Sequence, residues 1–259
     1  IGDPALHLWT AVAINFAVDH ADIISLGTTI TDIIVYNENG NAVEGARVTL
    51  LMGNDMIFST GFTDANGEIT LNWEAIETGD MHITVIKPNH RPYENIIEIS
   101  SDSGAAVSID PNVIDVYSGG SSNFNITLKN YGNQSANNVQ GELNSLSEHV
   151  TIENSIAVYG TILPGKAISK FYHVTIHGTV YEMEDLEFRL IITDDQGNTW
   201  LNSIPVNVSG PHLIISDYSG ETIPGSTTDL SLNLINEGSK TASNFTLELL
   251  SYENLVTVN

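Results

Sequence analysis

Apolar residues recur at every second position over most of the chain, which is the pattern of a β-strand with one buried face. The clearest row lies between Asn123 and Asn130, where Phe124, Ile126 and Leu128 alternate with polar residues. A second buried row is predicted for Leu186, Phe188, Leu190 and Ile192. In the segment that begins at Ile24, the even-numbered apolar positions are expected to face a core: Leu26, Ile30, Ile34 and Tyr36.

Clusters of Asn, Asp and Gly separate these rows and indicate hairpin turns. They occupy residues 37–41, 64–67, 119–120 and 194–198. Short alternating strands joined by such turns are typical of antiparallel β-sandwiches. Since helix signals are scarce, the sequence predicts an all-β fold.

One stretch of the chain is repeated after 106 residues. Phe124, Ile126 and Leu128 align with Leu230, Leu232 and Leu234, and Asn130-Tyr131-Gly132 aligns with Asn236-Glu237-Gly238. The register holds without gaps over about 35 residues, which favours duplication over chance.

The repeat and the turn-rich linkers divide the chain. We expect a first sandwich at 20–102, a second at 103–209 and the first half of a third at 210–259, with residues 1–19 outside all three. The first copy continues to Ser209, whereas the second stops at Asn259. The last sandwich is therefore expected to be truncated, and the chain to be a fragment of a longer protein.

The net charge of the chain limits the classes of partner that it can bind. Its 259 residues include 32 Asp and Glu against 8 Lys and Arg, a net charge of −24. Such a surface repels phosphate backbones, so no nucleic acid partner is expected. The longest apolar stretch, Leu8 to Val18, is too short to span a membrane, so no membrane insertion is expected. Without cysteine the chain has no disulfide, thiolate metal site or cysteine nucleophile.

Calcium is the one cofactor for which the sequence offers candidates, because it binds carboxylate and amide oxygens. Asp64, Asn66 and Glu68 present such oxygens at alternate positions, but the further ligands of an EF-hand loop are lacking, and the segment is first of all a hairpin turn. The same two interpretations apply to Asp194, Asp195 and Asn198. The acidic run Glu182, Glu184, Asp185 and Glu187 is expected to form a solvated loop.

A histidine pair is the other metal candidate. On a helix His173 and His177 would share one ion, but four residues along a strand span about 13 Å. We therefore expect two separate histidines on a polar face.

The sequence contains no compact motif for catalysis or for sugar binding. The sequence contains no Gly-x-Ser-x-Gly elbow and no glycine-rich phosphate loop, so this fragment is not expected to be an enzyme. Trp73, Trp200 and Tyr159 could form a sugar platform, but they lie in two different sandwiches and are expected to be structural. Trp9 is expected to pack the N-terminal tail against a domain.

The opening Gly2-Asp3-Pro4-Ala5-Leu6-His7-Leu8-Trp9 resembles the segment that closes the catalytic domain of gingipain-like (family C25) cysteine peptidases. In that family an immunoglobulin-like domain follows, and residues 43–50, 63–68 and 85–93 resemble its strands and turns. The resemblance covers about the first 100 residues, and the later sandwiches look like adhesion-type repeats of secreted bacterial proteins. It implies tandem immunoglobulin-like antiparallel β-sandwiches, the last one truncated, with residues 1–19 as the tail of an upstream catalytic-type domain and its connector. The family's catalytic Cys and His lie upstream of Gly-Asp-Pro, so no catalytic residue is carried over.

The resemblance implies a non-catalytic stalk or adhesion region of a secreted gingipain-like cysteine peptidase, outside the bacterial cell or on its surface. Its expected partners are the upstream catalytic domain of the same protein and a cell-surface or extracellular protein or polysaccharide. Two alternatives stay open. One is a structural subunit of an extracellular filament or surface layer completed by strand addition. The other is a carbohydrate-binding module.

Overall fold

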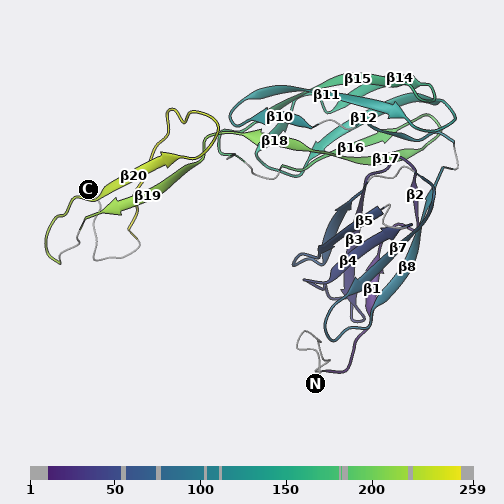
Figure 1. The fold of residues 1–259 in the computed structure, drawn as a ribbon, viewed down its shortest axis with the longest axis horizontal. Coiled ribbons are helices and arrows are strands. Elements are labelled where there is room, and N and C mark those ends of the chain that lie inside the picture. The colour runs from purple at the N-terminus through teal and green to yellow at the C-terminus, as the bar shows by residue number, and fades with distance from the viewer. Residues whose placement is uncertain are drawn as a thin grey trace.

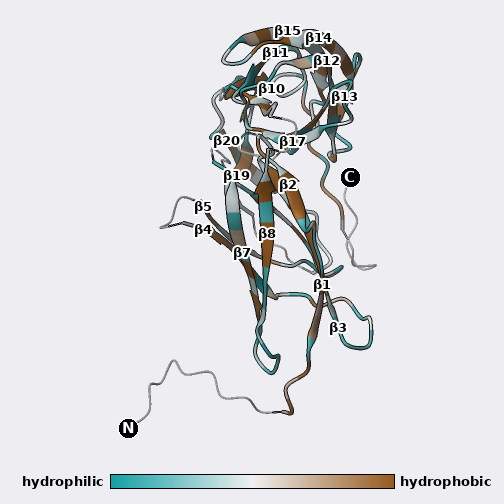
Figure 2. Ribbon diagram, turned by 90° about the vertical axis from the view of Figure 1, so that its right-hand side faces the viewer, coloured by the Kyte–Doolittle hydropathy of each residue, from teal (hydrophilic) through white to brown (hydrophobic). Residues whose placement is uncertain are grey.

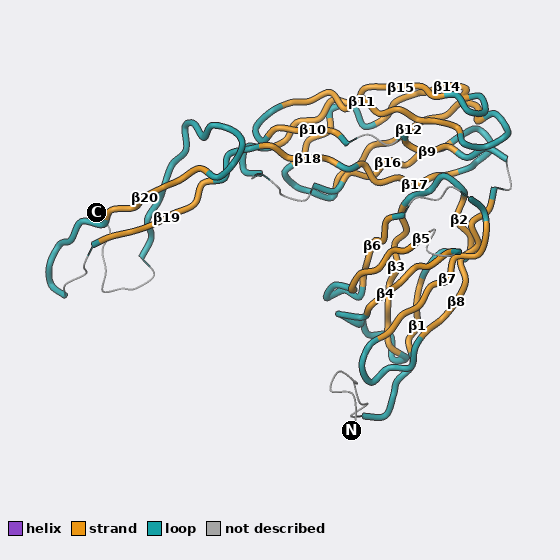
Figure 3. The backbone as a smooth tube through the Cα atoms, in the orientation of Figure 1, coloured by secondary structure: helices purple, strands orange, loops and turns teal. Residues whose placement is uncertain are grey.

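The computed structural model describes residues 11–53, 57–73, 77–101, 104–110, 113–180, 182, 186–220 and 224–251. Within these ranges the chain forms twenty β-strands joined by loops (Figure 3). The same ranges contain no helix that could cross a membrane. The predicted all-β class is confirmed, and the strands pack as β-sandwiches.

The first sandwich packs a three-stranded sheet, in the order β1-β3-β6, against a five-stranded sheet, in the order β2-β8-β7-β4-β5. Its strand β1 begins at Phe16, within the segment 1–19 that was expected to lie outside the sandwiches. Neighbouring strands are antiparallel except β2 and β8, which are parallel. Their core side chains alternate with polar ones, as the hydropathy colours along β8 show (Figure 2). The bounds are β1 Phe16–Asp19, β2 Ile23–Ser25, β3 Ile30–Asn37, β4 Arg47–Met52, β5 Ile57–Phe62, β6 Glu68–Asn72, β7 Gly79–Ile86 and β8 Tyr93–Ser100.

The prediction of which residues face the core is wrong for part of β3. Ile33 and Val35 are fully buried in the core. Of the predicted positions in β3, Ile30 is buried beside the second sandwich, outside this core, whereas Ile34 and Tyr36 are only partly buried. The alternation fails because a turn at Gly27, whose φ is +103°, separates β2 from β3. A turn resets which face each residue occupies, so the phase of one strand does not carry into the next.

The second sandwich packs the sheet β13-β15-β11-β9 against the sheet β14-β12-β16-β17, and a parallel pair, β10-β18, closes one side. Both predicted rows are confirmed, because Phe124, Ile126 and Leu128 and the row from Leu186 to Ile192 are all buried in one core. The bounds are β9 Val107–Ile109, β10 Ile114–Tyr117, β11 Ser121–Asn130, β12 Ala136–Ser145, β13 Val150–Ile152, β14 Ile156–Ile162, β15 Ala167–Ile176, β16 Phe188–Thr193, β17 Thr199–Ile204 and β18 Val206–Ser209.

A third sheet consists of β19, Leu213–Ser219, paired with β20, Ser231–Asn236. In Figure 1 the second sandwich lies across one end of the first, and the third sheet projects from the opposite end of the second. The third sheet reproduces contacts of the second sandwich with 106 added to each residue number. Asn130 Oδ1 accepts the N–H groups of Ala106 and Gly132, and its Nδ2 donates to the Gln134 carbonyl. Asn236 makes the same bonds with His212, Gly238 and Lys240.

Candidate functional site

The joint between the first and second sandwiches is built on the turn from Gly27 to Thr29. This turn lies along β17, the last strand of its sheet. Thr29 N–H donates to the Leu201 carbonyl at 2.8 Å, while the Thr29 and Thr28 hydroxyls accept the N–H groups of Ser203 and Leu201. These bonds occupy backbone groups that an edge strand otherwise leaves open to other chains.

Gly27 lets the turn approach the second sandwich closely. A Cβ at this position would lie 2.7 Å from the Val107 carbonyl oxygen and 3.2 Å from Trp200. Its φ of +103° is also in the region that favours glycine. Any other residue at position 27 would therefore push the two sandwiches apart.

Asn202 closes the centre of this joint. It occupies a core position of β17 between Trp200 and Ile204 and is fully buried. Its Nδ2 donates to the Gly27 carbonyl at 2.9 Å, and its Oδ1 accepts the Ser108 hydroxyl at 2.9 Å and the Ile109 N–H at 2.7 Å. One side chain thus connects both sheets of the second sandwich to the first. The motifs and spacings of the sequence did not single out Asn202, although a polar residue in an apolar row was a usable signal.

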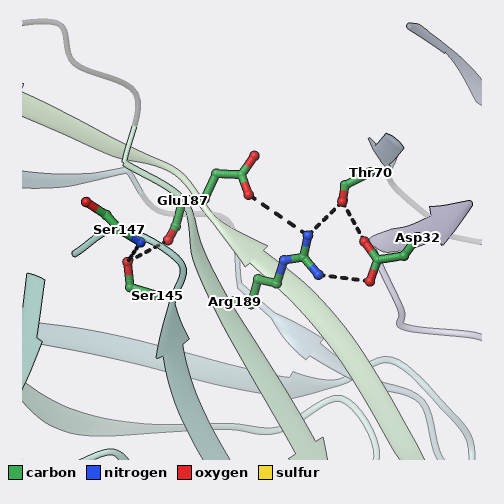
Figure 4. A network of polar contacts seen from close by, with 6 residues as sticks. All are labelled: Asp32, Thr70, Ser145, Ser147, Glu187 and Arg189. Carbon is green, nitrogen blue, oxygen red and sulfur yellow. Dashed lines mark hydrogen bonds and ion pairs between the residues drawn. The ribbon is translucent and has the colours of Figure 1, made fainter. Parts of the chain in front are cut away.

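A charged group fixes the joint a second time, as Figure 4 shows. Arg189 on β16 donates to Asp32 on β3 at 2.9 Å and to the Thr70 hydroxyl on β6 at 2.6 Å. The Thr70 hydroxyl in turn donates to Asp32, and Glu187 lies 3.9 Å from Arg189. The Arg189 side chain is 22% exposed and that of Asp32 is 55% exposed, so this pair mainly fixes orientation and contributes little stability.

Arg189 and Thr70 also line a cleft of about 250 Å³ between the two sandwiches, with Ile30, Asn72 and Ser203 among the other lining residues. The guanidinium already has Asp32 and Thr70 as partners. Its charge is therefore paired with Asp32 across the joint. The cleft is best understood as part of the joint.

A second joint connects the second sandwich to the third sheet. The Glu182 carboxylate accepts the N–H of Ser239, and Lys240 Nζ lies 4.5 Å from the centre of the Tyr117 ring. The hydrogen bond from Ser239 holds the pKa of Glu182 below its ordinary value. Two members of the predicted acidic loop, Glu182 and Glu187, therefore contact different neighbours, while Glu184 and Asp185 lie outside the described residues.

The calcium candidates Asp64 and Asn66 lie in the turn between β5 and β6, and Glu68 is the first residue of β6. The predicted hairpin is wrong, because β5 and β6 belong to different sheets and the turn carries the chain from one sheet to the other. Asp64 Oδ1 accepts the backbone N–H groups of Asn66 and Glu68, each at 2.8 Å, and Asp64 Oδ2 accepts Asn66 Nδ2 at 3.4 Å. Asp194 Oδ1 likewise accepts the backbone N–H groups of Gln196 and Asn198, and Asp194 Oδ2 accepts Asn198 Nδ2 at 2.7 Å. In the part of the chain that the structure describes, no group of three His, Asp or Glu side chains is placed to hold a metal ion. The observed hydrogen bonds are those of a turn.

His173 lies on the outer face of β15 and His177 directly follows this strand, both exposed, as predicted. His173 contacts Asn123 and His177 contacts Thr151, so the two rings have different neighbours. The ring centres of His177 and His149 are 6.4 Å apart, and sequence spacing did not indicate this pair.

The aromatic residues considered for sugar binding are buried. Trp73 and Tyr159 are 7% and 4% exposed, and Trp200 is completely buried, which confirms that all three are structural. Trp9 lies outside the described residues. A flat aromatic platform cannot be formed by side chains that solvent does not reach.

No family model and no curated protein matches the sequence. Among solved structures, the native conformation of E. coli alpha-2-macroglobulin is 10% identical, with a TM-score of 0.38, over 83% of this chain and 18% of that one. The BSP domain of a biofilm associated protein is 17% identical, with a TM-score of 0.30, over 73% and 29%. The tandem Ig repeats of Dlar are 10% identical, with a TM-score of 0.39, over 76% and 100%. This chain thus spans less than a fifth of the macroglobulin, and likenesses this weak carry nothing about partners or activity.

Proposed function

We propose that the chain is a non-catalytic, immunoglobulin-like stalk of an extracellular or surface-bound protein, which holds a neighbouring domain at a fixed distance and direction. The observation that supports this proposal is the first joint. Backbone hydrogen bonds, the buried Asn202 and the Arg189 group all connect the same two sandwiches. Two domains joined by a flexible linker alone would move independently.

The parent protein in this proposal is a gingipain-like cysteine peptidase, with its catalytic domain upstream. The support is the sequence resemblance of residues 2–9 and of the blocks between 43 and 93. One of those blocks, residues 63–68, forms a tight turn, although the strands on either side of it lie in different sheets. The burial of Trp73, Trp200 and Tyr159 weighs against the carbohydrate-binding alternative.

Antibodies against this chain test the proposal in two steps. Labelling of intact cells of the source organism, compared with permeabilised cells, gives the location, and we expect the intact cells to be labelled. Labelling only after permeabilisation would contradict an extracellular stalk.

The native polypeptide captured by the same antibodies then gives the parent protein. We expect an intact mass well above that of these 259 residues, with upstream peptides that contain a cysteine and a histidine. Upstream peptides without both residues would exclude the peptidase parent and leave the stalk proposal intact.

A further inference from the structure

Among the described sheet edges of the two sandwiches, β5 is the one that lacks protection against pairing with another chain. The turn at Gly27 covers β17, and β2, β9 and β13 have only three residues each. β1 and β6 carry charges at Asp19 and Glu68, and the pairing of β14 with β12 shifts register. β5 has six residues, no charge and no proline, and its pairing with β4 is regular. Such an edge is a template for a further strand.

The side chains that β5 turns to solvent are two phenylalanines with a threonine between them. Phe58 is 63% exposed and Phe62 is 67% exposed, and Thr60 is also exposed. Leu51 on β4 lies beside Phe58 and extends the apolar surface. In Figure 2, β4 and β5 form one side of the first sandwich. Covering these side chains removes apolar surface from water and is favourable in free energy.

The direction of the β5 amides follows from the residue after the strand. Thr63 N–H donates to the Ala46 carbonyl, on the β4 side. Successive residues of an antiparallel strand direct their amide and carbonyl groups to opposite edges. The backbone groups of Phe58, Thr60 and Phe62 consequently point to the free edge.

We propose that two copies of this chain pair through β5, antiparallel to each other, with a two-fold axis at Thr60. Phe58 of each copy then lies opposite Phe62 of the other copy, and the two Thr60 residues face each other. A symmetric interface requires a surface that is its own complement, and the spacing Phe-x-Thr-x-Phe has this property in an antiparallel pair. This proposal does not depend on the stalk function.

The backbone supports the same register. Pairing about Thr60 makes hydrogen-bonded pairs of all three outward-facing residues, Phe58, Thr60 and Phe62, in both copies. A shift of two residues would leave one of them unpaired in each copy and would separate the aromatic pairs. Aromatic pairs and Thr–Thr pairs directly opposite each other stabilise antiparallel strands. Both the backbone and the side chains therefore favour a second copy in this one register.

The net charge of −24 does not oppose this pairing, because β5 itself is neutral. The one charged residue of β4 and β5 is Arg47, which lies beside Phe62. From the spacing of strands and the rise per residue, the two copies of Arg47 would lie about 20 Å apart. This exceeds the Debye length of about 8 Å at physiological ionic strength, so their repulsion is screened.

The exposed area sets the expected strength of the dimer. An aromatic side chain buries roughly 150–250 Å² when it is covered completely. At the observed exposures of Phe58 and Phe62, a dimer would cover about 500 Å² of aromatic surface. Stable interfaces bury at least about 1,200 Å² in total. We therefore expect a reversible dimer with a dissociation constant above about 1 µM.

Sedimentation velocity of the full chain over a range of concentrations tests the proposal. One variant, Phe58→Lys/Phe62→Lys, places like charges opposite each other across the two-fold axis. A second, Phe58→Lys/Phe62→Glu, places opposite charges there in the antiparallel register, whereas a parallel register would bring like charges together. The matched control is Phe171→Lys, because Phe171 is also 63% exposed but lies on β15, which has a strand on each side. Circular dichroism checks that each variant keeps its strands.

We expect the unmodified chain and Phe171→Lys to dimerise alike as the concentration rises. Phe58→Lys/Phe62→Lys should weaken the dimer at least about tenfold, and Phe58→Lys/Phe62→Glu should restore at least about tenfold of affinity relative to it. In the unmodified chain, hydrogen exchange at residues 58–62 should slow as the concentration rises, a result that needs no variant.

A chain that stays monomeric at about 1 mM would overturn the proposal. A dimer that Phe58→Lys/Phe62→Lys leaves unchanged would overturn it as well, because the contact would then lie elsewhere. Equal weakening by the two double variants would exclude the two-fold register. Slower exchange at other residues but not at 58–62 would contradict the pairing of β5.

Discussion

The two equivalent asparagines, Asn130 and Asn236, allow one substitution to be made twice in a single chain. Asn130 is completely buried and makes four hydrogen bonds, the fourth from Nδ2 to the Ile162 carbonyl at 2.9 Å. Asn236 is exposed and makes three of the same bonds. The Asn→Ala change at each position thus removes similar bonds from different surroundings.

The expected magnitudes follow from burial. A hydrogen bond contributes about 1 kcal/mol net, and a buried partner left without one loses more. Asn130→Ala removes four bonds at a buried position, so we expect the free energy of unfolding of the second sandwich to fall by about 3–4 kcal/mol. At the exposed Asn236, water replaces the lost partners, so we expect Asn236→Ala to change local stability by less than about 1 kcal/mol.

Native-state hydrogen exchange followed by mass spectrometry measures both values, because it reports the opening free energy of each region separately. Peptides from β11 and β15 report on Asn130→Ala, and peptides from β19 and β20 report on Asn236→Ala. Two losses of equal size would refute the reasoning, because they would show that burial does not set the contribution of this side chain.

Three further substitutions test other contacts. Gly132→Ala places a Cβ 2.2 Å from the Gly104 carbonyl oxygen and should lower the free energy of unfolding of the second sandwich by about 2–3 kcal/mol, measured by calorimetry. The control Gly178→Ala, whose Cβ has ordinary contacts, should change it by less than about 1 kcal/mol. Burial raises the pKa of Tyr172 from 10.0 to about 12, so its contribution to stability is complete below pH 10 and is lost as pH rises towards 12. Urea unfolding should therefore show a free energy of unfolding that falls between pH 9 and 12. Tyr172→Phe should make this fall smaller. The pKa of Glu182 is lowered from 4.5, so its contribution to the second joint is complete above pH 4.5 and is lost as the pH falls through this lowered pKa. Cross-linking yields across that joint should therefore fall in acid, and Glu182→Gln should remove the dependence on pH.

Rows of alternating apolar residues predicted the second sandwich well, because a strand such as β11 has one face in the core and one in water. The same reasoning failed in β3, where the count began before the turn at Gly27. Strand alternation is a local property, and its phase cannot be predicted across a change of direction.

The joints could not be predicted from spacing, because they depend on which sheet edges meet. Arg189 and Asp32 are 157 positions apart, and nothing local marks them as partners. Asn202 did have a local signal, a polar residue in an apolar row, but its partners at Gly27 and Ser108 come from distant segments. The turn at Asp64 was predicted correctly, because its hydrogen bonds span only four residues, but the hairpin was not, because the sheet that each neighbouring strand joins is a long-range property.

The central claim, that the first joint is rigid, is tested most directly by a distance distribution between two spin labels. The chain contains no cysteine, so Ala65→Cys and Ala167→Cys, at exposed positions of the first and second sandwiches, give a single label on each. Double electron–electron resonance then measures the distribution. A single narrow peak is expected, which broadens in Asn202→Ala and stays narrow in the exposed control Asn207→Ala. A broad distribution in the otherwise unchanged chain would contradict the rigid stalk.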